Sequence, residues 1–195
     1  MKYSKLIILI FAVLFSFSLT DNINEKYIID SDFSLTIKGT SNVHDWQSNA
    51  RVLNGTSELS ISDDGYLTIQ SCEVTVPVKS IKSKKGSIMD KKTRKALSEK
   101  EYPNITYSLK RFTPILLSEN DFRSNTTGDL TVSGVTKSVD IEVIGKSIDD
   151  QTIELSSTVN LKMTDFGISP PTALMGTMKT GDDITIEFQI KLNRS

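Results

Sequence analysis

Hydrophobic and polar residues alternate along most of the chain with a period of two, which is typical of β-strands that bury one face. In residues 184–192, Ile, Phe and Leu alternate with Thr, Glu, Gln and Lys. The same alternation runs over residues 153–163, 139–143 and 33–37. Each of these segments is therefore predicted to be a strand with one apolar face to cover.

Two local features refine this pattern. The alternation in residues 66–78 changes phase around Ser71 and Cys72, which predicts a β-bulge, a device that bends strands in closed sheets. Residues 130–143 predict a tight hairpin about Gly134. With the other turn signals, the pattern predicts about eight or nine antiparallel strands.

Single-faced strands joined by short turns form either a two-sheet sandwich or an up-and-down barrel. The length of the chain and the single predicted helix favour the barrel. A barrel of about eight strands is just wide enough to be filled by its own side chains or to hold one slender ligand. Periodicity alone does not distinguish a packed interior from a hollow one.

One segment, at about residues 87–98, has helical spacing of its apolar residues. Ser87 is a candidate N-cap, Asp90 is placed to complete a capping box, and Pro103 follows the predicted helix. Lysine and arginine far outnumber acidic residues over residues 79–100. This basic segment either forms a solvated helix face or contacts anionic headgroups at a membrane surface.

The N-terminus has the composition of a secretory signal peptide. A short basic start precedes the apolar run LIILIFAVLFSFSL, which is shorter than the roughly 20 residues that span a bilayer. We therefore predict a cleaved signal peptide over residues 1–20 and a single domain over residues 21–195. No cysteine lies near the cleavage point for a lipid anchor, so we expect a periplasmic or secreted protein.

Composition excludes several classes of function. The chain has 23 Lys and Arg against 24 Asp and Glu, so no global charge attracts nucleic acid. It has a single cysteine, Cys72, and a single histidine, His44, so an internal disulfide is impossible and a metal site is poorly supplied with ligands. We therefore expect no metal and no catalytic cofactor.

His44 is followed by Asp45 and the single tryptophan, Trp46. In a strand, His44 and Trp46 would share one face and Asp45 would take the other, so this carboxylate would not orient the imidazole as in a catalytic triad. The G-x-S-x-G elbow of many hydrolases is also missing from the sequence. The preferred interpretation is hydrogen bonding at a pocket rim; headgroup contact and catalysis are the alternatives.

Residues 165–183 are apolar for an exposed loop, yet glycines and prolines oppose regular structure there. The segment includes Phe166, Leu174, Met175 and Met178, and methionine adapts to variable hydrophobic guests. It either lines the mouth of a ligand site or fills the core beneath a long loop.

Three segments together carry a family resemblance: LTIKGTSNVHDWQSNARV at residues 35–52, MDKKTRKALSEKEYPNITYSL at 89–109, and GDLTVSGVTKSVDIEV at 128–143. With TDFGI at 164–168, this order resembles the YceI-like, polyisoprenoid-binding proteins of the bacterial periplasm. The resemblance implies an all-β fold, a lipocalin-like antiparallel up-and-down β-barrel with one short α-helix between strands. It also implies an apolar tunnel that holds a long isoprenoid chain such as a quinone tail, and no catalytic residues.

We therefore expect an exported, non-enzymatic carrier of a long-chain polyisoprenoid, an isoprenoid quinone or a similar amphiphilic lipid. The alternatives are an enzyme or stress factor that acts on a small isoprenoid or lipid through His44, and a packed barrel that serves only as an interaction module. A homodimer is a further expectation. The predicted ligand-binding residues are Phe33, Leu35, Ile37, His44, Trp46, Ile88, Met89, Leu97, Ile105, Tyr107, Phe166, Leu174, Met175 and Met178.

Overall fold

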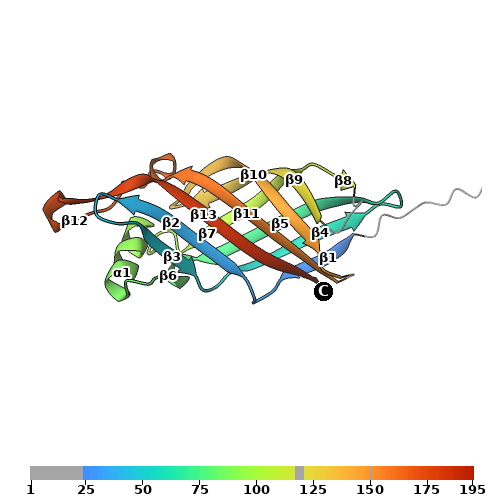
Figure 1. The fold of residues 1–195 in the computed structure, drawn as a ribbon, viewed down its shortest axis with the longest axis horizontal. Coiled ribbons are helices and arrows are strands. Elements are labelled where there is room, and N and C mark those ends of the chain that lie inside the picture. Colours follow the sequence, from blue (N-terminus) through green and yellow to red (C-terminus); the bar gives the residue numbers. More distant parts are fainter. Residues whose placement is uncertain (1–23, 117–120, 150) are drawn as a thin grey trace, which may run out of the picture.

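An antiparallel sheet closes on itself to form the body of the molecule (Figure 1). The computed structural model describes residues 24–116, 121–149 and 151–195, without the side chains of Ala173 and Leu174. The predicted signal peptide, residues 1–20, lies outside the described residues.

Eight strands make up the barrel, and three of them are interrupted along their length. The interrupted strands are β1 (Glu25–Ile29) with β2 (Ser34–Ser41), β3 (Trp46–Ala50) with β4 (Asn54–Ile61), and β5 (Tyr66–Pro77) with β6 (Ile81–Ser83). The continuous strands are β7 (Asn104–Phe112), β9 (Asp121–Val132), β10 (Val135–Ser147), β11 (Thr152–Lys162) and β13 (Met178–Arg194). The predicted all-β barrel of about eight strands is thus confirmed.

The last strand closes the barrel because β13 pairs with both halves of the first strand. Ile29 of β1 lies opposite Leu192, and Ile37 of β2 lies opposite Ile186. The remaining strands pair in the order β4, β5, β7, β9, β10, β11 and β13, and β2, β3 and β6 continue the sheet beyond β13. Two short strands lie off this path: β8 (Ile115–Leu116) pairs with β5, and β12 (Thr172–Ala173) pairs with β13.

The bulge and the hairpin predicted from the sequence are both present. Glu58 pairs with Ser71 while its neighbour Leu59 pairs with Ile69, so Gln70 is the extra residue of a β-bulge. The hairpin between β9 and β10 turns through Ser133 and Gly134, which have φ angles of 50° and 78°. Positive φ at both central residues is the geometry of the tight turns that match the twist of paired strands.

The helix α1 (Ser87–Ala96) is shorter than predicted and begins differently. Its N-cap is Gly86, at a φ of 85°, and no side chain caps the first turn, so the prediction of Ser87 as N-cap was wrong. Asp90 points back to the preceding strand instead, where its carboxylate accepts a 2.8 Å hydrogen bond from the backbone N–H of Ser83. This bond lowers the pKa of Asp90, and nearby Lys82 adds to the effect.

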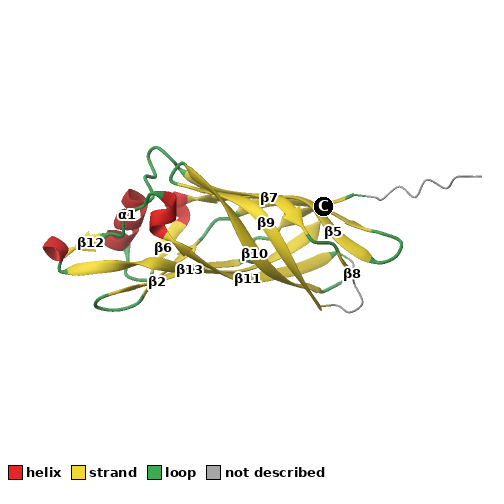
Figure 2. Cartoon of the chain, turned by 90° about the horizontal axis from the view of Figure 1, so that it is seen from above, coloured by secondary structure: helices red, strands yellow, loops and turns green. Residues whose placement is uncertain are grey.

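The helical segments of the described residues lie at the end of the barrel away from the C-terminus (Figure 2). They include α1 and the short 3₁₀ segments Val78–Ser80, Met163–Phe166 and Leu174–Gly176. The opposite end is filled by a core of buried side chains, in which Leu67 and Leu192 are completely inaccessible to solvent. The barrel therefore has one tightly packed end and one end that carries the helix.

Candidate ligand-binding cavity

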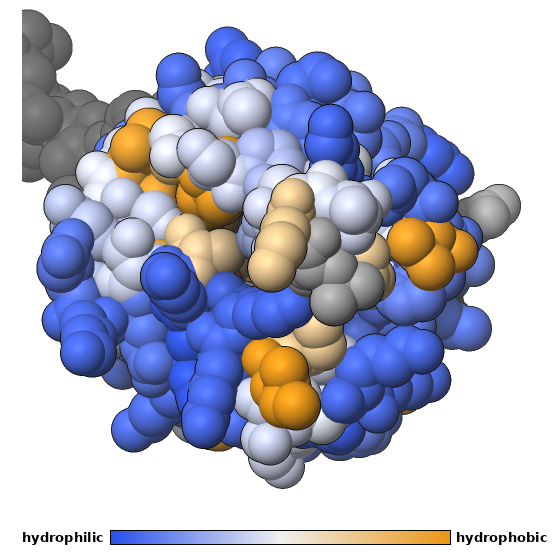
Figure 3. Space-filling view, turned by 90° about the vertical axis from the view of Figure 1, so that its left-hand side faces the viewer, coloured by the Kyte–Doolittle hydropathy of each residue, from blue (hydrophilic) through white to orange (hydrophobic). Residues whose placement is uncertain are grey.

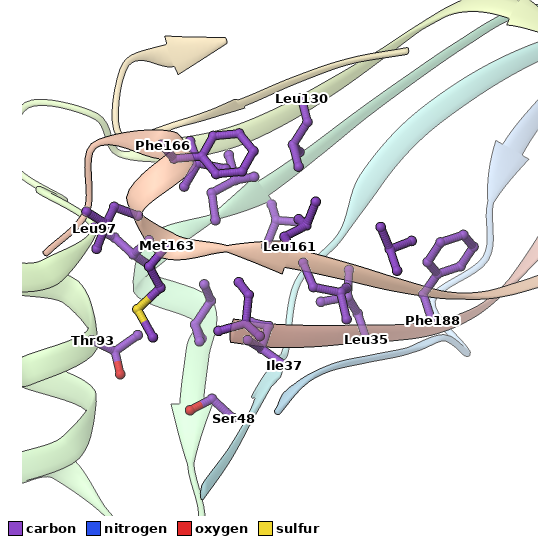
Figure 4. Close-up of a pocket in the computed structure, with 18 of the residues that line it drawn as sticks. Leu35, Ile37, Ser48, Thr93, Leu97, Leu130, Leu161, Met163, Phe166 and Phe188 are labelled. Carbon is purple, nitrogen blue, oxygen red and sulfur yellow. The ribbon is translucent and has the colours of Figure 1, made fainter. Parts of the chain in front are cut away.

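A cavity of about 460 Å³ runs from α1 into the barrel. This volume is within the range of about 300–1,000 Å³ that is usual for small-molecule sites. Figure 4 shows part of the lining, which consists mainly of aliphatic and aromatic side chains that extend from Thr93 and Leu97, near α1, to Leu35 and Phe188 deeper in the barrel. A fully packed barrel, one of the alternatives from the sequence, does not agree with this cavity.

The strand alternation explains why the lining is apolar. On β13, Ile184, Ile186, Phe188 and Ile190 line the cavity, while the intervening Thr185 bonds outward to Asn160. Since successive side chains of a strand point to opposite faces, each barrel strand contributes its apolar set to the interior. The apolar faces that the sequence predicted are those that surround the cavity.

The cavity is closed at its deep end. Its deepest lining residues include Val143 and Leu155, and beyond them the side chains of Ile153, Phe112 and Leu192 are buried in the main core. Within the described residues, the entrance for an elongated guest is therefore at the end that carries α1.

The mouth is formed by the exposed lining residues, which come from several segments at that end. His44 lies in the β2–β3 turn, Lys85 precedes α1, Lys92 is on α1, and Lys179 is at the start of β13. Asn42 holds this turn beside β13, because its side-chain oxygen accepts a 2.9 Å hydrogen bond from the backbone N–H of Lys179. Figure 3 shows this end of the molecule, where hydrophilic residues predominate and hydrophobic residues form separate groups.

Two aromatic rings of the wall lie against glycines of neighbouring strands. A Cβ atom on Gly128 would lie 2.4 Å from the ring of Tyr107, and one on Gly39 would lie 2.4 Å from the ring of Trp46. The indole N–H of Trp46 also donates a 3.1 Å hydrogen bond to the carbonyl oxygen of Thr40. These rings therefore lie along the wall over positions that have no side chain, and the centre of the barrel stays open.

Sequence reasoning missed the role of these glycines. Gly39 lies in β2 and Gly128 in β9, just outside the predicted strand 33–37 and the predicted hairpin 130–143. Within a strand, a residue without a side chain marks close approach by another group. That signal was available in the sequence, but the aromatic partner of each glycine comes from another strand.

Two groups with titratable protons lie in the wall. Burial raises the pKa of the Cys72 thiol to about 11. Burial also raises the pKa of the Tyr107 hydroxyl, and a hydrogen bond with the side chain of Thr126 lowers it in part. Both groups are therefore neutral near pH 7, and neither adds a charge to the cavity wall.

His44 lies in the turn between β2 and β3, which corrects its predicted placement in a strand. The hydroxyl of Ser41 accepts a 3.1 Å hydrogen bond from the backbone N–H of His44 and donates one of 2.7 Å to its carbonyl oxygen. The Nδ1 atom of the ring is 3.0 Å from the carbonyl oxygen of Asp45. The ring thus contacts the backbone of Asp45 and not its carboxylate, so this pair does not form a catalytic dyad.

The cavity brings together most of the predicted site residues. Those that line it are Leu35, Ile37, His44, Trp46, Met89, Leu97, Ile105, Tyr107, Phe166 and Met178.

Four predicted residues lie elsewhere or are not described. Phe33 precedes β2 and packs against the main core. Ile88 on α1 is 71% exposed and Met175 is fully exposed, so neither contributes to the lining. Ile88 faces solvent because Met89 occupies the inward side of the first helical turn, and Met175 lies at a turn with a φ of 55°. The side chain of Leu174 lies outside the described residues.

Other kinds of site are not evident. Among residues 24–116, 121–149 and 151–195, no three His, Cys, Asp or Glu side chains are grouped so that they could hold a metal ion. Over the same described residues, no helix has the length and hydrophobicity needed to cross a membrane.

A closed eight-stranded barrel with an apolar cavity open at one end has the architecture of lipocalin-like binding proteins. The chain belongs to the YceI-like domain family, because the model of that family matches residues 27–192. This confirms the resemblance that the sequence motifs suggested. None of the curated proteins matches the chain.

Solved structures share this fold at low sequence identity. A polyisoprenoid binding domain from Saccharophagus degradans, implicated in plant cell wall breakdown, has a TM-score of 0.66 at 13% identity; the match covers 89% of this chain and 100% of that chain. BcnA from Burkholderia cenocepacia has a TM-score of 0.64 at 18% identity, with 84% of this chain and 98% of that chain covered. The YCEI protein of Campylobacter jejuni has a TM-score of 0.58 at 19% identity, with coverages of 76% and 84%.

Proposed function

We propose that this protein is a non-enzymatic carrier that holds a long-chain polyisoprenoid, such as an isoprenoid quinone, or a similar amphiphilic lipid in its barrel. The observation that carries the proposal is the apolar cavity of about 460 Å³ with one open end. At roughly 0.8 kcal/mol per buried methylene, each five-carbon isoprene unit gains about 3–4 kcal/mol on leaving water. A few units are therefore enough for strong binding, even after the cost of ordering the chain. The similar fold of a polyisoprenoid binding domain supports the same class of ligand.

The direct test is to purify the protein from its native envelope, extract it with organic solvent and identify the extract by mass spectrometry. A polyisoprenoid or another long-chain lipid at near-equimolar amount is expected. Two variants on neighbouring positions give the matched comparison. Ile186→Gln places an amide in the cavity wall and should reduce the bound lipid, whereas Thr185→Gln, on the outer face, should retain it. Absence of any lipid from the protein, or equal loss in both variants, would contradict the proposal.

The non-enzymatic assignment is supported by the surroundings of His44, whose ring contacts a backbone carbonyl at the exposed rim. His44→Ala should therefore keep lipid binding and lose little stability. Loss of the biological function with binding intact would instead favour catalysis on a small isoprenoid or lipid.

We further propose that the carrier contacts a membrane surface through the basic 79–100 segment when it loads or unloads. Lys82 pairs with Asp90 and Arg94 with Glu99. The other basic residues of the segment form no ion pair within the described part of the chain: Lys79, Lys84, Lys85, Lys91, Lys92, Lys95 and Lys100. The exposed side chain of Ile88 adds an apolar contact on the same helix. Sedimentation with vesicles should show binding to anionic lipid that weakens with salt, and no binding to neutral lipid.

Export is part of the proposal, and the apolar run before residue 20 supports it. N-terminal sequencing of the protein from a periplasmic or secreted fraction should find the first residue near position 21. The single domain over residues 21–195 and the homodimer stay predictions, and sedimentation velocity would test the second.

A further inference from the structure

The described lining of the cavity mouth contains three lysines and no carboxylate. Lys85, Lys92 and Lys179 line it together with His44. They come from three parts of the chain: the β2–β3 turn, the basic 79–100 segment and the start of β13. Among the described residues that line the cavity, no Asp or Glu occurs. The rest of the lining is largely apolar, so the charge is confined to the open end.

Two nearby carboxylates, Asp90 on α1 and Asp182 on β13, are bonded to other groups. Asp90 accepts a hydrogen bond from the backbone of Ser83 and lies 3.6 Å from Lys82. Asp182 accepts hydrogen bonds of 2.9 Å and 2.6 Å from the N–H and the hydroxyl of Thr164. As far as the described residues extend, none of the three mouth lysines takes part in an ion pair.

The shape of the cavity fixes the orientation of an amphiphile. Because the deep end is packed with side chains such as Leu67 and Leu192, a hydrophobic tail must enter first. The headgroup then stays at the mouth, beside the lysines. A neutral headgroup would leave these ammonium groups without a partner, whereas an anionic one would pair with them through charge-assisted hydrogen bonds.

We infer that the bound amphiphile carries an anionic headgroup, a phosphate or a carboxylate, which Lys85, Lys92 and Lys179 hold at the mouth of the cavity. This inference rests on the proposed function and specifies its ligand class. It favours a polyprenyl phosphate or a long-chain fatty acid over a neutral isoprenoid quinone.

The test compares ligands that differ only in the headgroup. Geranylgeranyl phosphate is compared with geranylgeraniol, and palmitate with hexadecanol, below the concentrations at which they aggregate. Trp46 is the single tryptophan and lines the cavity, so its fluorescence reports binding. Solvent-exposed ion pairs are individually weak, so three together should give roughly a 10-fold preference for the anion. The preference should shrink at 1 M salt, where the Debye length is about 3 Å.

Two sets of variants separate the mouth from general surface charge. The triple variant Lys85→Gln/Lys92→Gln/Lys179→Gln should bind phosphate and alcohol with nearly equal affinity. The control is Lys84→Gln/Lys91→Gln. These two lysines are the sequence neighbours of Lys85 and Lys92 but do not line the cavity, so this variant should keep the 10-fold preference.

Each outcome has a definite meaning. Preference for phosphate alone or for palmitate alone identifies the headgroup and supports the inference. Equal binding of anion and alcohol by the unmodified protein, or equal loss of preference in both sets of variants, overturns it while the carrier function stands. If the unmodified protein binds none of the four ligands, the proposed function itself fails.

Discussion

Replacement of Gly128 by alanine tests whether the open interior depends on an aromatic ring that lies on a glycine. The added Cβ would be 2.4–2.5 Å from two ring carbons and the hydroxyl oxygen of Tyr107, against the roughly 3.5–4.0 Å of an ordinary carbon–carbon contact. The ring must therefore move by about 1 Å or more. Because both residues belong to paired strands, β9 and β7, the ring has room to move only towards the cavity.

The expected effect on stability is the difference between two opposing contributions. Without a clash, alanine in place of a glycine within a strand stabilises by about 0.5–1 kcal/mol. Overpacking costs about 1–3 kcal/mol, so we expect Gly128→Ala to lower the free energy of unfolding by up to about 2.5 kcal/mol. Binding should weaken as well, since a ring that displaces two methylenes of the guest costs about 1.6 kcal/mol, or roughly 10-fold in affinity.

Urea unfolding and lipid titration measure the two effects. The control is the double variant Gly128→Ala/Tyr107→Leu compared with Tyr107→Leu alone. Without the ring, the alanine should no longer destabilise, which gives a coupling energy of about 0.5–3 kcal/mol between the two sites. If Gly128→Ala stabilises the protein and leaves binding unchanged, the ring does not rest on this glycine and our account of the open interior is refuted.

Three further predictions concern other parts of the barrel. With a pKa of about 11, Cys72 should react with N-ethylmaleimide at pH 8 about 100-fold more slowly than a free thiol, and reaction at an ordinary rate would contradict its burial. Leu67→Ala, in the packed end, should lower the free energy of unfolding in urea by about 2–5 kcal/mol. Leu161→Ala, at the cavity wall, should lower it by about 1–2 kcal/mol. Equal losses would argue for a uniformly packed barrel. Because the pKa of Asp90 is lowered, its ionised form stabilises the fold above the ordinary pKa of 3.8, and this contribution is lost as the pH falls through the lower folded-state value. Asp90→Ala should therefore lower the melting temperature at pH 7, and the stability of this variant should depend less on pH in acid. An unchanged acid profile would contradict the Ser83 contact.

The strand faces were the part of the fold that could be predicted best. The alternation along residues 184–192 depends on the geometry of a single strand, in which successive side chains point to opposite sides, and those apolar residues do line the cavity or the core. The bulge at Gln70 could be predicted for the same reason, since an extra residue shifts the alternation within one strand.

The helix and the turns were predicted less well. Ser87 has the chemistry of an N-cap, but the strand before the helix offers the N–H of Ser83 to Asp90, and this tertiary contact replaces a capping box. His44 lies in a turn that hydrogen bonds of the Ser41 hydroxyl stabilise. The prediction that His44 and Trp46 share one face of a strand was therefore wrong. Ile88 is apolar but exposed, because helical spacing does not say which of two adjacent residues faces the barrel. Met175 is exposed because it lies at a turn with a φ of 55°.

The sequence by itself determined that this chain forms single-faced strands, that those strands close around an apolar interior, and to which family the chain belongs. Each of these depends on residues that are neighbours in the chain or on the order of short motifs. Only the tertiary structure decided that one end of the barrel is packed and the other hollow, that the ring of Tyr107 rests on Gly128, and that lysines far apart in the sequence line the same cavity. These features depend on the register between strands and on the position of α1 over the barrel, which bring together residues that are far apart in the sequence.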